Sequence, residues 1–396
     1  VIQNALPVAQ TVTGGGSYCS GGTGVHVGMG MSQSGISYQL YRNGIPVGSM
    51  VAGTGLTLDF GLQTAAGDYT VTGTNTATGC TNAMSGMATV SIDALPVIQT
   101  VTGGGNYCEG GSGVVIDLAG SQAGISYQLY NGTAAAGMEV FGTGLPVSMG
   151  TYTVPGSYTI EATDLTTGCV RTMSGVATIG INPLPGLQTT GGGGTLCQNG
   201  AGVSVTLNGS QTGVTYQLYN GSSTVGAPAV GTGGAINFGL QTVAGTYTVQ
   251  AVNPTTGCVR DMNGSATVLV NPLPINQTLS GGGPYCAEGA GVTLSLSGTN
   301  TNVTYQLYNG STAVGGPVTG TGLPVSLGTH TAAGTYTVLA TSTITGCQRT
   351  MSGVATISIN PLPVTHTVTG GGAYCTGGAG VAVGLNSSNT GMNYQL

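Results

Sequence analysis

The sequence predicts an all-β protein of tandem immunoglobulin-like β-sandwich domains with an 89-residue repeat, arranged as an elongated rod. Three observations support this fold class. Cysteine, tyrosine and methionine recur at a fixed spacing of 89 residues. Short segments between turn signals alternate apolar and polar side chains, as half-buried strands do, and no segment has helical periodicity. A period of 89 is too long for a solenoid turn and suits a complete small domain.

The repeat keeps its register without insertion or deletion. Its landmarks are Cys19, Cys108, Cys197, Cys286 and Cys375; Cys80, Cys169, Cys258 and Cys347; Tyr38, Tyr127, Tyr216, Tyr305 and Tyr394; Tyr69, Tyr158, Tyr247 and Tyr336; and Met84, Met173, Met262 and Met351. The predicted division is 1–4 as the end of a preceding repeat, then repeats 1 to 4 at 5–93, 94–182, 183–271 and 272–360, and a partial repeat 5 at 361–396. Because the chain begins and ends inside a repeat, we expect its true termini to lie elsewhere.

Each element of one repeat follows from local pattern. Val8, Gln10 and Val12 indicate a first strand, which the glycine run 14–16 should end as a turn. The expected strands that follow contain Val25, Val27, Met29 and Met31; residues 36–41; Leu56, Leu58 and Phe60; residues 67–71, leading on to Cys80; and residues 88–92. Asn43-Gly44 is a strong hairpin signal. Seven or so such strands are typical of an immunoglobulin-like sandwich, and Gly67-x-Tyr69-x-Val71 suits a tyrosine corner.

A short proline segment separates the repeats. It reads Asn182-Pro183-Leu184-Pro185 and recurs at 271–274 and 360–363, whereas the copies at 5–7 and 94–96 lack the first proline. Proline fixes its own φ and biases the preceding residue toward extended conformations, so this segment should be a stiff spacer.

Composition excludes several classes of function. Only 4% of the residues are charged, the net charge is −6, and the chain has four arginines and no lysine. Nucleic-acid binding and a polybasic membrane contact are therefore not expected, because both need clustered positive charge. No stretch approaches the ~18–20 apolar residues of a membrane span, so direct membrane insertion is not expected either.

Two cysteines per repeat at constant positions indicate structural disulfides and an oxidising, extracellular location. All nine cysteines are expected to take part. The second and sixth strands of such a sandwich run the same way, so Cys19, before the second strand, and Cys80, after the sixth, should lie near opposite ends of one domain. This favours pairing across joints: Cys19–Cys169, Cys108–Cys258 and Cys197–Cys347. One alternative is pairing within repeats, Cys19–Cys80, Cys108–Cys169, Cys197–Cys258 and Cys286–Cys347, if the glycine-rich loop folds back. Another is that the thiols are free and buried.

No catalytic, metal or cofactor site is expected, because no candidate group recurs in register. His26, His330 and His366 fall at three unrelated repeat positions, and the acids are too scattered for paired carboxylates or calcium loops. Arg171, Arg260 and Arg349 do recur two residues after a cysteine, although Asn82 breaks the series. Either a hydrogen bond between domains or a solvated loop charge would explain them. The methionine series should fill the core.

The combination of Tyr18-Cys19-x-Gly-Gly, Tyr38-Gln39-Leu40-Tyr41-x-Asn43-Gly44, Gly67-x-Tyr69-Thr70-Val71 and Thr78-Gly79-Cys80 resembles a known class of repeat. These are the immunoglobulin-like tandem repeats of giant Bacteroidota cell-surface adhesins. They include adhesins of the gliding-motility (SprB-like) type, exported by the type IX secretion system. The resemblance covers the whole chain and implies an extracellular protein that is anchored to the cell or forms filaments.

The leading hypothesis is therefore a non-enzymatic structural array that forms the stalk or filament of a bacterial surface adhesin or appendage. One alternative is a self-assembling extracellular fibre or sheath, since the uncharged surface leaves lateral packing open. Another is a repeat that itself binds glycan or ice. The expected partners are neighbouring repeats of the same chain and, in a filament, identical chains, with a distal ligand that the sequence does not specify.

Overall fold

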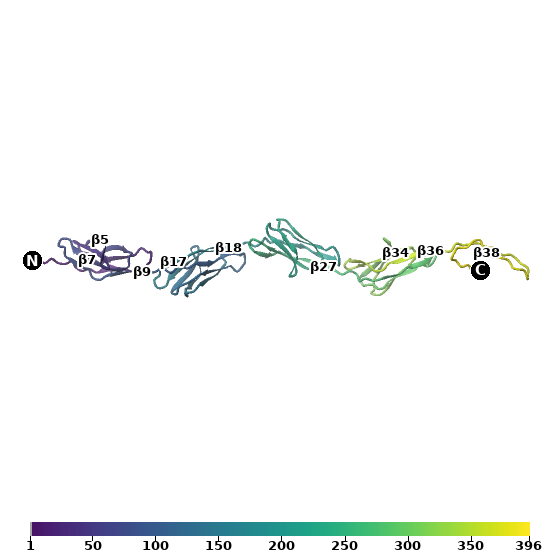
Figure 1. Ribbon diagram of the computed structural model, residues 1–396, viewed down its shortest axis with the longest axis horizontal. Coiled ribbons are helices and arrows are strands. Elements are labelled where there is room, and N and C mark those ends of the chain that lie inside the picture. Colours follow the sequence, from purple (N-terminus) through teal and green to yellow (C-terminus); the bar gives the residue numbers. More distant parts are fainter. Residues whose placement is uncertain (1) are drawn as a thin grey trace. The chain divides into compact units, whose positions relative to one another are not determined.

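The computed structural model describes residues 2–396. The regular secondary structure among these residues consists of β-strands (Figure 1). The chain forms two compact units, Val1–Leu184 and Pro185–Leu396.

The first unit holds two copies of a nine-strand pattern. In repeat 1 the strands are β1 (Val12–Gly14), β2 (Gly16–Cys19), β3 (Val25–Met29), β4 (Ile36–Arg42), β5 (Ile45–Ala52), β6 (Leu58–Gln63), β7 (Gly67–Asn75), β8 (Thr81–Ala83) and β9 (Ala88–Asp93). In repeat 2 they are β10 (Val101–Gly103), β11 (Gly105–Cys108), β12 (Val114–Leu118), β13 (Ile125–Asn131), β14 (Ala134–Phe141), β15 (Val147–Tyr152), β16 (Gly156–Asp164), β17 (Val170–Thr172) and β18 (Ala177–Asn182).

The second unit repeats this pattern twice and then begins it again. The strands of repeat 3 are β19 (Thr190–Gly192), β20 (Gly194–Cys197), β21 (Val203–Leu207), β22 (Thr215–Asn220), β23 (Ser223–Val230), β24 (Ile236–Gln241), β25 (Gly245–Val252), β26 (Val259–Asp261) and β27 (Ala266–Asn271). Those of repeat 4 are β28 (Leu279–Gly281), β29 (Gly283–Cys286), β30 (Val292–Leu296), β31 (Val303–Asn309), β32 (Thr312–Thr319), β33 (Val325–His330), β34 (Gly334–Ser342), β35 (Gln348–Thr350) and β36 (Ala355–Asn360). Residues beyond 360 add β37 (Val368–Gly370) and β38 (Val383–Leu385).

Each complete repeat is a sandwich of a three-stranded and a six-stranded sheet. In repeat 1 the small sheet has the order β1-β3-β6, and the large one has the order β2-β9-β7-β4-β5 with β8 beside β7. Neighbouring strands are antiparallel except β2 and β9, which are parallel. The same order recurs in the other three repeats, so the chain is a tandem array of immunoglobulin-like domains. Each sheet lies inside one expected repeat, while the precise boundaries stay a prediction.

The glycine run ends the first strand at Gly14, as expected, but the segment is a crossing between sheets and not a turn within one sheet. The chain crosses from one sheet to the other there: β1 pairs with β3 in the small sheet, and β2 pairs with β9 in the large one. Gly14 and Gly15 have φ values of 92° and 78°, which residues other than glycine rarely adopt. A Cβ at Gly14 would lie 2.1 Å from the carbonyl oxygen of His26, so only glycine allows this crossing.

Other strand bounds also differ from the expectation. Val8 and Gln10 precede the first strand, which is short because its pairing with β3 covers only three residues. Met31 lies beyond the end of β3 and is 54% exposed, so it does not continue the buried face of Val27 and Met29.

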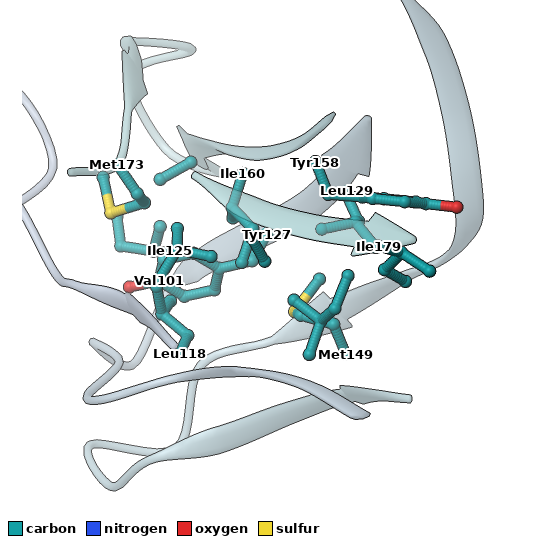
Figure 2. Close-up of a cluster of buried hydrophobic side chains, with 13 residues drawn as sticks. Val101, Leu118, Ile125, Tyr127, Leu129, Met149, Tyr158, Ile160, Met173 and Ile179 are labelled. Carbon is teal, nitrogen blue, oxygen red and sulfur yellow. The ribbon is translucent and has the colours of Figure 1, made fainter. Parts of the chain in front are cut away.

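Each repeat has its own apolar core between its two sheets. In repeat 2 the core residues are Val101, Ile116, Leu118, Ile125, Tyr127, Leu129, Met149, Tyr158, Ile160, Ala162, Met173, Ala177 and Ile179 (Figure 2). Met173 is buried, as the methionine series predicted, and its sulfur also accepts a hydrogen bond from the backbone N–H of Gln99 (3.3 Å). The equivalent methionines of the other repeats do the same.

Each complete repeat has two buried tyrosines whose hydroxyl groups form hydrogen bonds with backbone groups a few residues away. The hydroxyl of Tyr158 donates to the carbonyl of Val154 at 2.8 Å, which is the tyrosine-corner bond expected from the sequence. The same bond forms in all four complete repeats. In the second series, the hydroxyl of Tyr127 accepts from the backbone N–H of Gln122 (2.9 Å), so a bulky polar side chain is buried without an unpaired group.

The long edge strand of each large sheet is interrupted by a bulge. Asn43 and Gly44 make the expected hairpin turn with φ values of 50° and 82°, and β5 then pairs with β4. Leu40 lies opposite Val47, but Tyr38 lies opposite Val51, so β5 has two more residues than β4 in this interval. The side-chain amide of Gln39 donates to the carbonyls of Val47 (3.0 Å) and Gly48 (3.3 Å) inside the bulge. The bulge recurs in every complete repeat.

Candidate functional site: the joint between repeats

The first half of the joint is the end of β2, which carries Cys19. Cys19 lies opposite Asp93, the last residue of β9, because β2 and β9 are parallel and in register. The backbone N–H of Ser20 donates to the carbonyl of Asp93 (2.9 Å), and the hydroxyl of Tyr18 donates to the carbonyl of Thr64. Cys19 is therefore fixed at the end of repeat 1 from which the spacer leaves. Cys197 has the same position in repeat 3, opposite Asn271.

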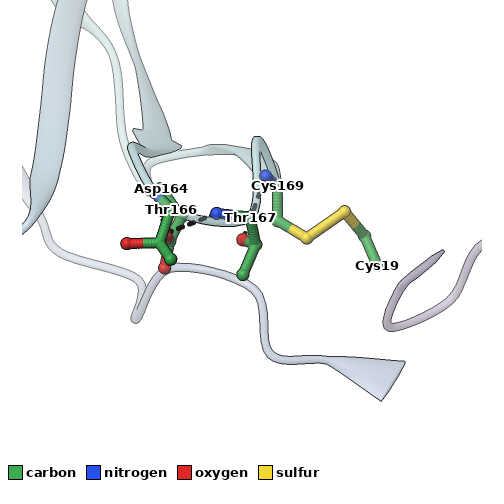
Figure 3. Close-up of a disulfide and its surroundings, with 5 residues drawn as sticks. All are labelled: Cys19, Asp164, Thr166, Thr167 and Cys169. Atoms are coloured by element: carbon green, nitrogen blue, oxygen red, sulfur yellow. Dashed lines mark hydrogen bonds between the residues drawn. A yellow bond between two sulfur atoms is a disulfide. The ribbon is translucent and has the colours of Figure 1, made fainter. Parts of the chain in front are cut away.

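The second half is the loop between β16 and β17, which carries Cys169. One carboxylate oxygen of Asp164 accepts from the backbone N–H groups of Thr166 (2.8 Å) and Thr167 (3.0 Å) (Figure 3). The hydroxyl of Thr167 in turn accepts from the N–H of Cys169 (3.3 Å), and the N–H of Gly168 donates to the carbonyl of Asp164 (2.8 Å). These bonds hold the loop that carries Cys169 in one conformation.

A disulfide joins these two halves in each unit. Cys19 bonds to Cys169 with a Cα–Cα distance of 5.6 Å (Figure 3). Cys197 bonds to Cys347 in the same way, at 5.5 Å. Both bonds follow the pairing across joints that the sequence favoured. Cys169 and Cys347 are fully buried, whereas Cys80, which occupies the same loop position in repeat 1 and is free, is partly exposed.

The alternative pairing within repeats, Cys19–Cys80, Cys108–Cys169, Cys197–Cys258 and Cys286–Cys347, does not occur. Gly67 of β7 lies opposite Val90, close to Cys19, and the chain then runs eight residues farther to Asn75 before it reaches Cys80. Eight residues of strand span about 26 Å, so the two cysteines of one repeat lie at opposite ends of the sandwich. A disulfide needs Cα atoms within about 7 Å of each other.

Three cysteines expected in disulfides are free: Cys80, Cys286 and Cys375. Both observed bonds join a cysteine to another that lies 150 residues later in the sequence. Cys80, Cys286 and Cys375 have no cysteine at that separation in the given sequence. The remaining expected pair, Cys108–Cys258, would join one residue from each unit and stays a prediction.

The spacer between repeats is held at a single peptide group. A guanidinium nitrogen (Nη1) of Arg171 donates to the carbonyl of Pro96 (3.2 Å), and the N–H of Val97 donates to the side-chain oxygen of Gln122 (2.6 Å). Both polar groups of the Pro96–Val97 peptide are therefore bound by side chains. We call this arrangement the spacer clamp. It lies within one repeat, so the recurring arginines bind their own spacer and do not bridge two domains.

The spacer clamp recurs, and Asn82 does not break the series. Asn82 donates to the carbonyl of Pro7 at 2.7 Å, so a shorter side chain makes the same contact. The other clamp bonds are Gln33 with Val8 (2.7 Å), Arg260 with Pro185 (3.1 Å), Gln211 with Gly186 (3.0 Å) and Arg349 with Pro274 (3.2 Å). The sequence interpretation missed the glutamines, although Gln33, Gln122 and Gln211 are themselves 89 residues apart.

Asp164 gives the joint of repeat 2 an electrostatic property of its own. Hydrogen bonds from the backbone N–H groups of Thr167 and Thr166 stabilise the carboxylate and lower the pKa of Asp164 below its usual value. Asn75 and Asn253 occupy the same loop position in repeats 1 and 3, and their side-chain oxygens accept equivalent bonds without a titratable group.

The histidines lie in separate, unrelated surroundings. His26 projects from β3 beside Asp59, with 2.8 Å between Nδ1 and a carboxylate oxygen, and both side chains are exposed. His330 donates from Nε2 to the carbonyl of Leu327 (3.1 Å), and His366 contacts Asn389. Across the described residues, no three His, Cys, Asp or Glu side chains gather in a way that could hold a metal ion. Nor does any helix in residues 2–396 have the length and apolarity to cross a membrane.

Comparison with known proteins gives matches only among solved structures. No protein-family model matches the chain, and no curated protein matches it. Sidekick-1 immunoglobulin domains 1–4 are 9% identical, with a TM-score of 0.24 and coverage of 90% of this chain and 95% of that chain. A Dscam structure is 12% identical (TM-score 0.20; 89% and 99% coverage), and the full ectodomain of mouse nectin-like molecule 4 is 13% identical (TM-score 0.28; 66% and 98% coverage).

Proposed function

We propose that this chain is a structural segment of an extracellular stalk or filament, which projects a bacterial surface adhesin or appendage and carries tension along its length. The function is mechanical and non-enzymatic. The observation that carries the proposal is the disulfide that joins one repeat to the next in each unit, Cys19–Cys169 and Cys197–Cys347.

The chemistry of the joint supports a load-bearing role. A flexible tether between independent domains would need neither a covalent bond across the joint nor side chains dedicated to its spacer. Here the Pro96–Val97 peptide is bound on both sides by Arg171 and Gln122, and a disulfide spans the same joint. Both features restrict bending where the domains meet. Disulfides also place the chain in an oxidising compartment, which suits an extracellular location.

The edges of the sheets favour a stalk of single chains over a laterally assembled fibre. A long, flat edge strand with unpaired backbone groups recruits strands from other molecules, and bulges and prolines prevent this. Every β5-type edge strand carries a bulge, and β5, β23 and β32 also contain a proline. The edge strand at the other side of the large sheet, such as β2, has only four residues.

The finer part of the proposal rests on the repeat motifs. Their resemblance to the tandem repeats of Bacteroidota surface adhesins supports a cell-surface or gliding-motility adhesin secreted by the type IX system. The distal ligand would be bound by another part of such a protein, and the repeats would set its distance from the cell.

Negative-stain electron microscopy of the purified, oxidised chain tests the proposal. Separate straight rods with one bead per 89-residue repeat are expected, and reduction should introduce kinks at the joints. Long fibres or sheets from the same sample would overturn the stalk proposal in favour of self-assembly. Retention of the isolated repeats on a glycan array or on ice would favour the binding alternative.

A further inference from the structure

The disulfides described above divide the chain into a short covalent path and two large loops. Each bond joins residues 150 apart, Cys19 to Cys169 and Cys197 to Cys347. A continuous covalent route from residue 1 to residue 396 therefore needs only residues 1–19, 169–197 and 347–396. The segments 20–168 and 198–346 are closed loops beside this route.

The folded cores lie mostly inside the loops. In repeat 1, every core residue except Val12 falls within 20–168. In repeat 2, only Met173, Ala177 and Ile179 of the core lie outside that loop. The covalent route itself runs through the first two and last two strands of the repeats, for example β17, β18, β19 and β20 within 169–197.

We propose that these disulfides form a covalent load path that limits the extension of the array, so that tension on the stalk cannot draw out the chain of the closed loops when its domains unfold. This inference rests on the proposed stalk function. An ordinary chain of sandwich domains lengthens under force as each domain unfolds. Here, unfolding any segment of 20–168 or 198–346 releases no length, because the ends of that loop are already joined.

The expected lengths follow from chain geometry. At ~3.6 Å per extended residue, the 98 residues of the route (19, 29 and 50 in its three parts) can reach about 350 Å. Without the bonds, all 396 residues can reach about 1,400 Å. The loop that each of these disulfides closes contains roughly 500 Å of extended chain, which does not bear the applied force.

Single-molecule force spectroscopy on the full 396-residue chain, held by tags at its two termini, tests this directly. The background carries Cys80→Ser, Cys286→Ser and Cys375→Ser, which removes the free thiols and leaves both bonds intact. The oxidised molecule should stop lengthening at about 350 Å, and the same molecule in a reductant should extend to about 1,400 Å in steps. The double variant Cys19→Ser with Cys169→Ser should reach a length between these two limits.

Extension of the oxidised molecule well beyond 350 Å before its attachments fail would overturn the load path. Reduction of a single tethered molecule supplies the comparison even where a cysteine variant does not fold. The measurement is independent of electron microscopy of the stalk: fibres in the microscope would overturn the stalk function, whereas early lengthening under force would overturn only the load path.

Discussion

At the scale of single residues, the spacer clamp shows how one side chain can hold a joint. Arg171 lies in β17, two residues after Cys169, and binds the carbonyl of Pro96 at 3.2 Å. Asn82 makes the same bond in repeat 1 with a shorter side chain. The clamp therefore depends on a donor at this position and not on its charge.

Replacing the donor should loosen the spacer. In Arg171→Ala the carbonyl of Pro96 loses its partner, and we expect the N–H of Val97 to exchange with solvent about tenfold faster, equivalent to ~1.4 kcal/mol for a hydrogen bond of this kind. Hydrogen exchange at Val97 measures the effect. Arg171→Asn is the matched control, since it copies repeat 1 and should keep most of the protection. Equal exchange in the wild type and Arg171→Ala would contradict the clamp.

Asp164 should make the joint loop of repeat 2 sensitive to acid. Its pKa is lower in the folded loop than its usual value, so its contribution to stability is present above the unfolded pKa of about 3.9 and is lost as pH falls through the folded pKa. Below about pH 4, the N–H groups of Thr166 and Thr167 should therefore lose protection, measured by hydrogen exchange corrected for intrinsic rate.

Asp164→Asn should remove this acid sensitivity while keeping the loop, because Asn75 already caps the same loop in repeat 1. The N–H groups of Ala77 and Thr78 serve as an internal control within one sample. Acid-induced loss of protection in both loops alike would show that the carboxylate is not its cause.

At the scale of elements, we expect the bulged edge strand to keep each large sheet from pairing with a neighbouring molecule. In β23, Leu218 lies opposite Val225 and Tyr216 opposite Ala229, so two residues of β23 are extra. Gln217 fills the bulge by donating to the carbonyls of Val225 (3.1 Å) and Gly226 (3.4 Å).

Deleting Ala227 and Pro228 should restore a flat edge strand and cause association between chains. We expect oligomers in light scattering coupled to size-exclusion chromatography, whereas the parent chain should be a monomer. The same deletion combined with Thr224→Lys is the control, because a lysine on the edge opposes pairing with another strand. If the deletion variant stays monomeric while correctly folded, the bulge is not what protects the edge.

At the scale of the whole molecule, the closed loops determine whether the two ends of the chain stay covalently connected after the backbone is cleaved. Arg42 lies within the loop closed by Cys19–Cys169, and Arg260 lies within that closed by Cys197–Cys347. A cut at either residue therefore leaves both ends of the molecule covalently attached.

Trypsin should consequently act slowly on the native array, and its products at Arg42 and Arg260 should separate only after reduction. The chain offers four arginines and no lysine, and three of the arginines are bound in spacer clamps. Electrophoresis should show a species of 38.6 kDa without reductant and fragments with it. Rapid digestion would contradict the expected resistance to trypsin, and separation of the Arg42 or Arg260 products without reductant would contradict the loop assignment.

The sequence by itself determined the 89-residue repeat, the all-β pattern, the tyrosine corner and the Asn43-Gly44 hairpin. These depend on periodicity and on turns of a few residues, which are visible locally. It also favoured pairing across joints, because strand direction alone separates Cys19 from Cys80 within one repeat.

Only the tertiary structure decided the rest. The glycine run 14–16 changes sheets because β2 finds a parallel partner in β9, some 70 residues later in the chain, which no local pattern specifies. Asn82 and Arg171 perform one task because each faces the carbonyl of a spacer proline 75 residues earlier. The position of the bulge likewise follows from the register between two strands. These features depend on contacts between residues distant in sequence, and such contacts are set only when the sandwich closes.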